Sequence, residues 1–330
     1  MKLLWLDLNS SYAHSSLALP ALHAQIADDT TIEWCIVSAT INENTGMVVS
    51  RIHKHRPDII AATNWLFNHE QLLHIISRAK ALLPHCCIVL GGPEFLGNNE
   101  AFLYKNKFVS GVFRGEGEEV FPQWLKVWNH SKETWKSITG LCYLDENGRY
   151  QDNGIARVMN FSQLVSPEKS CFFNWSKPFV QLETTRGCFN TCAFCVSGGE
   201  KPVRTIPLEA IRERLNDIHQ HGIKNVRVLD RTFNYNNKRA KELLDLFRQY
   251  PDICFHLEIH PAFLSEELKQ ELSVLPKGLL HLEAGIQSLK ESVLQQSRRI
   301  GKLSDALEGL KYLCSLKNME THADLIAGLP

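Results

Sequence analysis

The sequence predicts an α/β protein in which a doubly wound, Rossmann-like parallel sheet is followed by a partial (β/α) barrel. Two observations support this fold class. Short apolar runs alternate with helical patterns over the first 130 residues, and a second series of five strand and helix units starts at Phe179. Strands separated by helices of this length favour parallel sheets. We expect domains at residues 1–130 and 179–330, joined by a linker at 131–178, because 330 residues allow two or three domains.

The first domain alternates strands and helices. The expected strands are short apolar runs at residues 2–8, 31–37, 58–62, 86–90 and 109–113. The expected helices carry their apolar residues on one face and lie at residues 16–27, 46–55, 69–83 and 118–128. The alternation is lost between residues 129 and 177, where Asn147-Gly148 between two apolar runs predicts a small hairpin at 141–150. We interpret this segment as a linker.

The second domain repeats the pattern. Its expected strands lie at residues 179–184, 225–229, 254–259, 280–284 and 321–326. Its expected helices lie at residues 207–221, 238–248, 265–275 and 303–316. Five such units are typical of a barrel. The sequence stops at Gly328-Leu329-Pro330, directly after the fifth strand, and an edge strand is an unfavourable end. We therefore expect a fragment of a longer chain, or a naturally shortened form.

Composition excludes several protein classes. With 44% hydrophobic and 22% charged residues the chain is neither disordered nor collagen-like. The 36 basic residues are balanced by 36 acidic ones, which argues against a dedicated nucleic-acid binder. The apolar run at the N-terminus is too short for a signal peptide or a membrane span. We expect a cytoplasmic protein with no membrane partner, acting on a substrate that the sequence does not identify.

Three of the ten cysteines follow a pattern that indicates a metal centre. Cys188, Cys192 and Cys195 form a CxxxCxxC motif directly after the first strand of the second domain. Three neighbouring thiolates suit a soft metal site. A tetrahedral zinc site needs a fourth ligand, and no nearby cysteine or histidine at finger spacing supplies one. A cubane iron–sulfur cluster with one open iron fits better, although a structural zinc or thiol site remains the alternative.

This motif resembles the cluster loop of the radical S-adenosylmethionine superfamily. Arg186-Gly187 before the first cysteine and Phe194 before the last also match that loop. The resemblance implies a [4Fe-4S] cluster on the three cysteines, with the fourth iron binding S-adenosylmethionine. It also implies an external electron donor, since the reduced cluster cleaves S-adenosylmethionine to methionine and a deoxyadenosyl radical. The protein's part is to bind and orient the cofactors and the substrate, and to exclude water from the reaction.

The same resemblance nominates residues that contact S-adenosylmethionine, because ligands of a barrel lie at the C-terminal ends of its strands. Apart from the cluster cysteines, the expected contacts are Phe194, Asp230, Glu258, Glu283, Gln287 and Gly328. Gly198-Gly199-Glu200 spells a triplet known in the superfamily, but its position makes the match coincidental. Arg298 and Arg299 are possible carboxylate partners, although such residues are more often solvated.

The first domain resembles the cobalamin-binding domain that precedes the barrel in one branch of this superfamily. The expected cobalamin contacts follow the C-terminal ends of its strands and are Tyr12, Thr63, Asn64, Gly91, Gly92, Gly115 and Glu116. A DxHxxG signature is absent, because Asp7 is followed by Leu8 and Asn9. Cobalt is therefore not expected to be held by the histidine of that signature. His14 is a possible substitute, but a loop histidine is the more common case.

Together the two resemblances imply a cobalamin-dependent radical S-adenosylmethionine enzyme, most consistent with a methyltransferase acting on an unactivated carbon. An alternative is a radical oxidoreductase, cyclase or isomerase whose first domain binds cobalamin differently or not at all. A third possibility is a non-catalytic iron–sulfur or zinc scaffold. The catalytic residues and the substrate are not indicated by the sequence.

Overall fold

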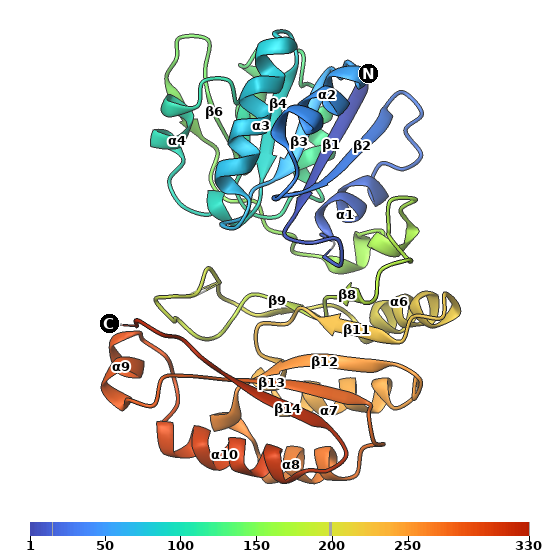
Figure 1. Ribbon diagram of the computed structural model, residues 1–330, viewed down its shortest axis with the longest axis vertical. Helices are drawn as coiled ribbons and strands as arrows, with labels where there is room; N and C mark the ends of the chain where they lie inside the picture. The colour runs from blue at the N-terminus through green and yellow to red at the C-terminus, as the bar shows by residue number, and fades with distance from the viewer. Residues whose placement is uncertain (15, 198–199, 330) are drawn as a thin grey trace. The chain divides into compact units, whose positions relative to one another are not determined.

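The computed structural model describes residues 1–14, 16–197 and 200–329. The chain divides into two compact units, unit 1 at Met1–Asn174 and unit 2 at Trp175–Pro330 (Figure 1). Within the described residues, no helix is both long and apolar enough to cross a membrane.

Unit 1 is built on a seven-stranded sheet with the order β2-β1-β3-β4-β5-β6-β7. The strands β1 to β5 are parallel, as predicted. Their bounds are β1 Lys2–Asn9, β2 Glu33–Thr40, β3 Ile59–Thr63, β4 Cys87–Gly91 and β5 Gly111–Phe113. Since β2 and β3 lie on opposite sides of β1, the strand order reverses between β1 and β3. Ligands of doubly wound sheets bind at the C-terminal end of this switch point.

Helices cover both faces of this sheet. Their bounds are α1 Ala18–Ala24, α2 Thr45–His55, α3 His69–Leu82, α4 Glu100–Lys105 and α5 Val120–Leu125. Alternate strand residues form two cores, because successive side chains of a strand point to opposite faces. Leu4 and Leu6 pack with residues of α2 and α3, whereas Leu3 and Trp5 pack with residues of α1 and α5. The helix α4 was not predicted, because six residues give too short a pattern to recognise.

The hairpin predicted at 141–150 is present, but most of the segment 131–178 is not a linker. The strands β6 (Leu141–Leu144) and β7 (Tyr150–Asp152) extend the sheet of unit 1 in the antiparallel direction. The side chains of Leu141, Cys142 and Tyr143 are fully buried there. These apolar residues cover the edge of β5, and unit 1 therefore continues to Asn174. Short 3-10 turns complete it at Pro93–Phe95, Thr134–Ser137, Phe161–Gln163 and Pro167–Lys169.

Unit 2 contains a five-stranded parallel sheet in the order β8-β11-β12-β13-β14. The strands are β8 Val180–Leu182, β11 Asn225–Val228, β12 Cys254–Ile259, β13 Leu280–Gln287 and β14 Glu320–Leu325. The helices are α6 Leu208–Gln220, α7 Asn237–Phe247, α8 Glu266–Ser273, α9 Glu291–Gln296 and α10 Leu303–Ser315. Two 3-10 turns lie at Phe233–Tyr235 and Pro261–Phe263. Because neighbouring strands follow one another along the chain, this sheet has the order of a barrel, as the predicted partial barrel requires.

The two faces of this sheet differ in polarity. Burial alternates along β12 and β13, and the buried face packs on helices through contacts such as Phe255 on Phe247 of α7, with ring centroids 4.1 Å apart. The opposite face carries charged and imidazole side chains. We call it the polar face; it includes Arg227, His256, Glu258, His281, Glu283 and His322.

Candidate cofactor sites

The cysteine triplet lies in a loop whose base is closed by a small antiparallel ladder. The ladder pairs β9 (Thr185–Arg186) with β10 (Arg204–Thr205) and was not predicted. Inside it, the Cys188 amide donates to the Glu200 carbonyl at 2.9 Å. Gly187 has a positive φ of 92°, and a Cβ there would lie 2.5 Å from the same carbonyl. Only glycine fits this position without strain, which explains the Arg-Gly sequence before the first cysteine.

The three thiols lie close enough for Cys188 and Cys195 to affect the charge of Cys192. Cys188 and Cys192 are buried and Cys195 is exposed. Burial raises the pKa of Cys192, and the other two cysteines raise it further, whereas the Arg299 guanidinium opposes both effects. Arg299 Nη1 lies 3.9 Å from the Cys192 sulfur. A guanidinium beside this group stabilises the thiolate, which is the form that binds metal.

The segment around Arg299 also connects the cysteine loop to the end of β13. Arg299 Nη2 donates to the Gly285 carbonyl at 2.5 Å, and a bulge occurs between Gly285 and Gln287. Gln287 has a positive φ of 69°, which is unusual for a residue with a side chain. Such backbone strain often accompanies binding sites. Cys192, Arg299, Gly285 and Gln287 thus form one connected set, in which Arg299 is not simply a solvated charge. Its expected contact with a carboxylate of S-adenosylmethionine stays a prediction.

The cysteine loop is held in a second place. The side chain of Asn190 is buried, and its Oδ1 accepts a hydrogen bond from the Ile300 amide at 3.2 Å. The Ala193 amide donates to the Ser297 carbonyl at 2.9 Å. These residues were not predicted, because an asparagine between two cysteines has no spacing signature of its own.

Asp230, an expected contact of S-adenosylmethionine, is bound to the end of β8. It is 1% exposed, and its Oδ1 accepts hydrogen bonds from the Thr184 and Thr185 amides at 2.8 and 2.9 Å. The Thr184 hydroxyl donates to the other carboxyl oxygen. Burial raises the pKa of Asp230, while these donors oppose the rise. The contact with S-adenosylmethionine stays a prediction, and the observed bonds indicate that Asp230 joins the ends of β8 and β11.

Glu258 and Glu283 are paired across β12 and β13 on the polar face. Burial raises the pKa of Glu258 to about 7, in spite of the opposing charge of Arg231. Glu283 accepts a hydrogen bond from His256 Nε2 at 2.8 Å. The pKa of Glu283 is lowered, because hydrogen bonds from Asp324 and His256 outweigh the effect of its burial. The two glutamates therefore differ in charge near neutral pH.

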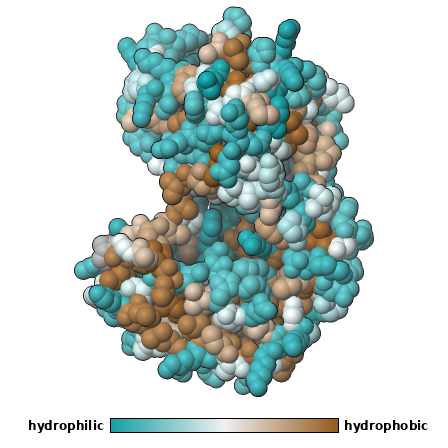
Figure 2. All heavy atoms as spheres, viewed as in Figure 1, coloured by the Kyte–Doolittle hydropathy of each residue, from teal (hydrophilic) through white to brown (hydrophobic). Residues whose placement is uncertain are grey.

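The other predicted contacts of S-adenosylmethionine are less defined. Phe194 is half-buried in the cysteine loop, and Gly328 has a positive φ of 82° in the turn after β14. Of the triplet Gly198-Gly199-Glu200, the two glycines lie outside the described residues, as does Pro330. Figure 2 shows apolar side chains gathered near α9 and the end of β14. The exposed ones are Leu289, Ile300, Leu325 and Ile326.

In unit 1, one asparagine joins the strand ends at the switch point. Asn68 Nδ2 donates to the Leu8 carbonyl of β1 at 2.9 Å and to the Thr63 carbonyl of β3 at 3.1 Å. Its Oδ1 accepts from the Trp65 amide at 2.9 Å. We call the ends of β1 and β3 around Asn68 the crevice floor. Because all three bonds are made by one buried side chain, this floor has a defined shape. Asn68 was not predicted, because its partners lie on two strands that only the fold brings together.

The structure brings four predicted cobalamin contacts together beside this floor. Thr63 is paired with Gly91, and the Asn64 amide donates to the Gly91 carbonyl at 2.7 Å. Gly92 has a φ of 112°, and a Cβ there would lie 2.5 Å from the Asn64 carbonyl. A Cβ on Gly91, by contrast, would meet nothing closer than 3.9 Å. Gly92 is thus required by the fold, whereas Gly91 leaves space.

Two other predicted contacts have structural roles in the chain. A Cβ on Gly115 would lie 2.2 Å from the Ala156 carbonyl, and the Glu116 carboxylate accepts a hydrogen bond from the Val158 amide at 2.6 Å. Both residues therefore hold the segment that follows β7 against the end of β5. Whether they also contact cobalamin stays a prediction.

The loops that follow β1 and β3 expose the apolar side chains of Tyr12, Leu66 and Phe67, which we call the crevice rim and which suit a large, flat ligand. Tyr12 is 76% exposed, and Leu66 and Phe67 are also exposed. Trp65 and Phe67 stack with ring centroids 6.3 Å apart. His14 Nδ1 is hydrogen-bonded to Asn9 Oδ1 at 2.8 Å. Ser15, in the same loop, lies outside the described residues.

Comparison with known families identifies both units. Residues 182–330 match the family described as the Radical SAM superfamily, and residues 8–125 match the B12 binding domain. The chain thus combines a radical S-adenosylmethionine domain with a B12-binding domain that precedes it. This domain order agrees with the expectation from the sequence.

Other members share its sequence or fold. An uncharacterised methyltransferase of Pyrococcus horikoshii is 26% identical over 292 residues, which cover 84% of this chain and 62% of that protein. The structure of the cobalamin-dependent radical enzyme OxsB, with aqua-cobalamin and S-adenosylmethionine bound, superimposes with a TM-score of 0.80 at 17% identity. The match covers 98% of this chain and 49% of the OxsB chain. The structure of the methyltransferase TsrM of Kitasatospora setae, with cobalamin and a [4Fe-4S] cluster bound, superimposes with a TM-score of 0.77 at 15% identity. The match covers 100% of this chain and 70% of the TsrM chain. The chain thus spans about three fifths of the first relative and half of OxsB.

The residues present fit the cofactors of the superfamily. Cys188, Cys192 and Cys195 supply three soft ligands, and Arg299 compensates the negative charge that such a cluster brings. The glycine pair and the apolar rim of unit 1 suit the tail and the ring of cobalamin. The radical S-adenosylmethionine domain therefore implies a [4Fe-4S] cluster and S-adenosylmethionine as cofactors, and the B12-binding domain implies cobalamin.

Proposed function

We propose that this protein is a cobalamin-dependent radical S-adenosylmethionine methyltransferase acting on an unactivated carbon. The observation that carries the proposal is the combination, in one chain, of the cysteine triplet beside Arg299 and the B12-binding domain. The relative from Pyrococcus horikoshii and TsrM are both named methyltransferases, which supports this reading. An electron donor outside the chain completes the proposed reaction, since the radical chemistry needs an electron.

When bound, the cluster and S-adenosylmethionine supply a carbon radical, and cobalamin supplies a methyl group. The chain contributes the environment for this chemistry. Arg299 holds the Cys192 sulfur and the Gly285 carbonyl, and so fixes the cysteine loop relative to the end of β13. Gln287 projects from the strained position next to that carbonyl and is suited to orient the polar end of S-adenosylmethionine. In unit 1, Asn68 and Gly92 shape the strand ends that would hold cobalamin.

The test does not need the unidentified substrate. The protein is reconstituted anaerobically with iron, sulfide and hydroxocobalamin, desalted, and supplied with a reductant and S-adenosylmethionine carrying a deuterated methyl group. We expect one cobalt per chain, 5′-deoxyadenosine from radical cleavage, and S-adenosylhomocysteine together with deuterated methylcobalamin from methyl transfer. The matched control, Cys192→Ala, is expected to form no 5′-deoxyadenosine.

The products distinguish the two candidate functions. Deoxyadenosine with bound cobalt but without S-adenosylhomocysteine or methylcobalamin contradicts methyl transfer. That result favours a radical oxidoreductase, cyclase or isomerase, and OxsB, which has this fold, is described only as a radical enzyme. Retained cleavage in Cys192→Ala would reject the assignment of the cluster.

A further inference from the structure

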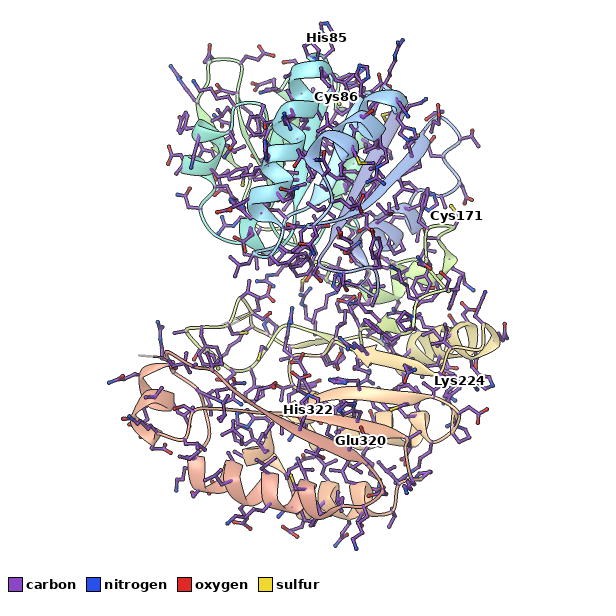
Figure 3. The ribbon with its side chains drawn as sticks, viewed as in Figure 1. His85, Cys86, Cys171, Lys224, Glu320 and His322 are labelled. Atoms are coloured by element: carbon purple, nitrogen blue, oxygen red, sulfur yellow. The ribbon has the colours of Figure 1, made fainter. Side chains whose placement is uncertain are left out.

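Three adjacent strands place two histidines and a glutamate together on the polar face of unit 2. His256 lies on β12, Glu283 on β13 and His322 on β14, where Figure 3 labels it. Glu283 is opposite His322 in the register of β13 and β14. One candidate ligand atom from each of the three residues lies within 4.8 Å of the others. Glu283 is also a predicted contact of S-adenosylmethionine, but neither that contact, the cysteine triplet nor the B12-binding domain explains the two histidines.

The two histidine nitrogens approach the same carboxylate oxygen. His256 Nε2 and His322 Nε2 lie 2.8 and 3.6 Å from the same oxygen, Glu283 Oε2. The longer distance is outside the range of a hydrogen bond. In a tetrahedral zinc site with bonds of about 2.0–2.1 Å, ligand atoms are separated by about 3.3 Å. The two separations from the Glu283 oxygen lie on either side of this value, and all three ligand atoms lie within 4.8 Å of one another. Rotations of the side chains can bring the three atoms toward the tetrahedral separation.

A fourth residue holds one ligand in the orientation that a metal needs. His281 Nε2 is hydrogen-bonded to His322 Nδ1 at 2.8 Å. Metal-binding histidines commonly use their second ring nitrogen in this way, because the bond orients the ring and selects the tautomer. In the tautomer in which His322 Nδ1 donates, the lone pair of Nε2 points toward the Glu283 oxygen. A cation between these two atoms relieves the repulsion between their lone pairs.

The donor set also selects the kind of ion. Two imidazole nitrogens and one carboxylate oxygen suit zinc and other divalent transition metals, whereas magnesium and calcium prefer oxygen ligands. Three protein ligands leave one position of a tetrahedral ion to water or a substrate atom. The side chains of His256, Glu283 and His322 are 20%, 32% and 46% exposed. An ion can therefore reach them from solvent.

We propose that His256, Glu283 and His322 form a binding site for a divalent transition-metal ion of the zinc type. Its ligands are distinct from Cys188, Cys192 and Cys195. The site does not depend on the proposed methyl transfer, because it is argued only from the geometry of β12, β13 and β14.

The test measures metal binding in a full-length chain that lacks the cluster ligands. In the parent variant, Cys188, Cys192 and Cys195 are replaced by alanine, so that thiolates of the triplet cannot bind the probe. Cobalt(II) is titrated anaerobically and then displaced with zinc(II). We expect one equivalent of cobalt, visible d–d absorption typical of low coordination number, and no thiolate-to-cobalt charge-transfer band.

Variants connect the signal to the proposed ligands. His322→Ala and Glu283→Gln are each expected to weaken binding about 100-fold or more, since even the loss of an outer-shell partner costs about 10–100-fold. Glu283→Gln preserves the size of the side chain and guards against a folding defect. The control is His74→Ala, which removes an exposed histidine of α3 in unit 1 and should leave binding unchanged.

Two results would overturn the proposal. One is the absence of saturable cobalt binding in the parent variant, which would mean that the three residues form only a hydrogen-bonded network. The other is binding that survives His322→Ala and Glu283→Gln, which would place the ion elsewhere in the chain.

Discussion

Removal of the Asp230 carboxylate should loosen the join between β8 and β11. In Asp230→Ala, the Thr184 amide, the Thr185 amide and the Thr184 hydroxyl lose their acceptors in a site that is 1% exposed. A buried polar group left without a partner costs about 1–3 kcal/mol, and relaxation of the hydroxyl reduces the sum. We therefore expect a local loss of about 4 kcal/mol. By the usual relation of about 1.4 kcal/mol per factor of ten, this is about a thousandfold increase in local opening.

Hydrogen exchange followed by mass spectrometry measures this opening peptide by peptide. Peptides that cover β8 and β11 are expected to exchange about a thousandfold faster in Asp230→Ala, whereas peptides from β1 in unit 1 should not change. Asp230→Asn should have a much smaller effect, because Oδ1 still accepts the two amides and the Thr184 hydroxyl can turn to accept from the new Nδ2. Asp252→Asn serves as the control, since that carboxylate is exposed and pairs with Lys224 only at 3.7 Å.

The reasoning is refuted if β8 and β11 exchange at the wild-type rate in Asp230→Ala. The same variants separate the structural role of Asp230 from its predicted contact with S-adenosylmethionine. If Asp230→Asn keeps the exchange pattern but weakens binding of S-adenosylmethionine to the reconstituted protein, the residue has both roles. Unchanged affinity would remove it from the cofactor site.

Three further predictions address the cluster, the crevice and the pH dependence. Cys192→Ala should lose the cluster, seen as a fall in bound iron and sulfide and the loss of visible absorption; full iron retention would contradict the assignment. Gly92→Ala should destabilise unit 1 and abolish cobalamin uptake, because its Cβ would lie 2.5 Å from a carbonyl, whereas Gly91→Ala should leave the apoprotein intact and reduce only cobalamin uptake. Equal apoprotein stability of the two glycine variants would show that the close contact is absent. Burial and the charge of Arg299 lower the pKa of His260 to about 3. Between pH 3 and 6.5 the unfolded chain therefore binds more protons than the folded chain, and the free energy of unfolding falls as the pH falls through this window. His260→Leu should therefore reduce the loss of stability between pH 7.5 and 5 by about 2 kcal/mol in urea unfolding, and an unchanged loss would show that His260 is charged in the folded protein.

The fold was largely predictable because its strands are marked by local patterns. The parallel strands of both units and the hairpin at Asn147-Gly148 follow from apolar runs and turn residues. The sequence did not reveal that Leu141 and its neighbours complete the first sheet, since pairing between distant strands has no local signal. The short ladder of β9 and β10 was missed for the same reason, because each strand has two residues.

The candidate sites were predictable where spacing is specific and not where contacts are made in three dimensions. The cysteine triplet could be read from its spacing alone. Arg299 is 107 residues from Cys192 in the sequence, and Asn68 is 60 residues from Leu8, so both partnerships arise only from the fold. Asp230 was noticed because it ends a strand, but its hydrogen bonds to Thr184 and Thr185 depend on the neighbouring strand.

The asparagine that joins β1 and β3 has a consequence for how quickly and how tightly unit 1 takes up its ligand. Asn68 satisfies the Leu8 and Thr63 carbonyls before any ligand arrives. The crevice floor is therefore preorganised, and little conformational entropy is lost there on binding. The rim around Tyr12 and Leu66 is instead exposed to solvent. Ligand exchange should accordingly be limited by rearrangement of the rim rather than by the floor.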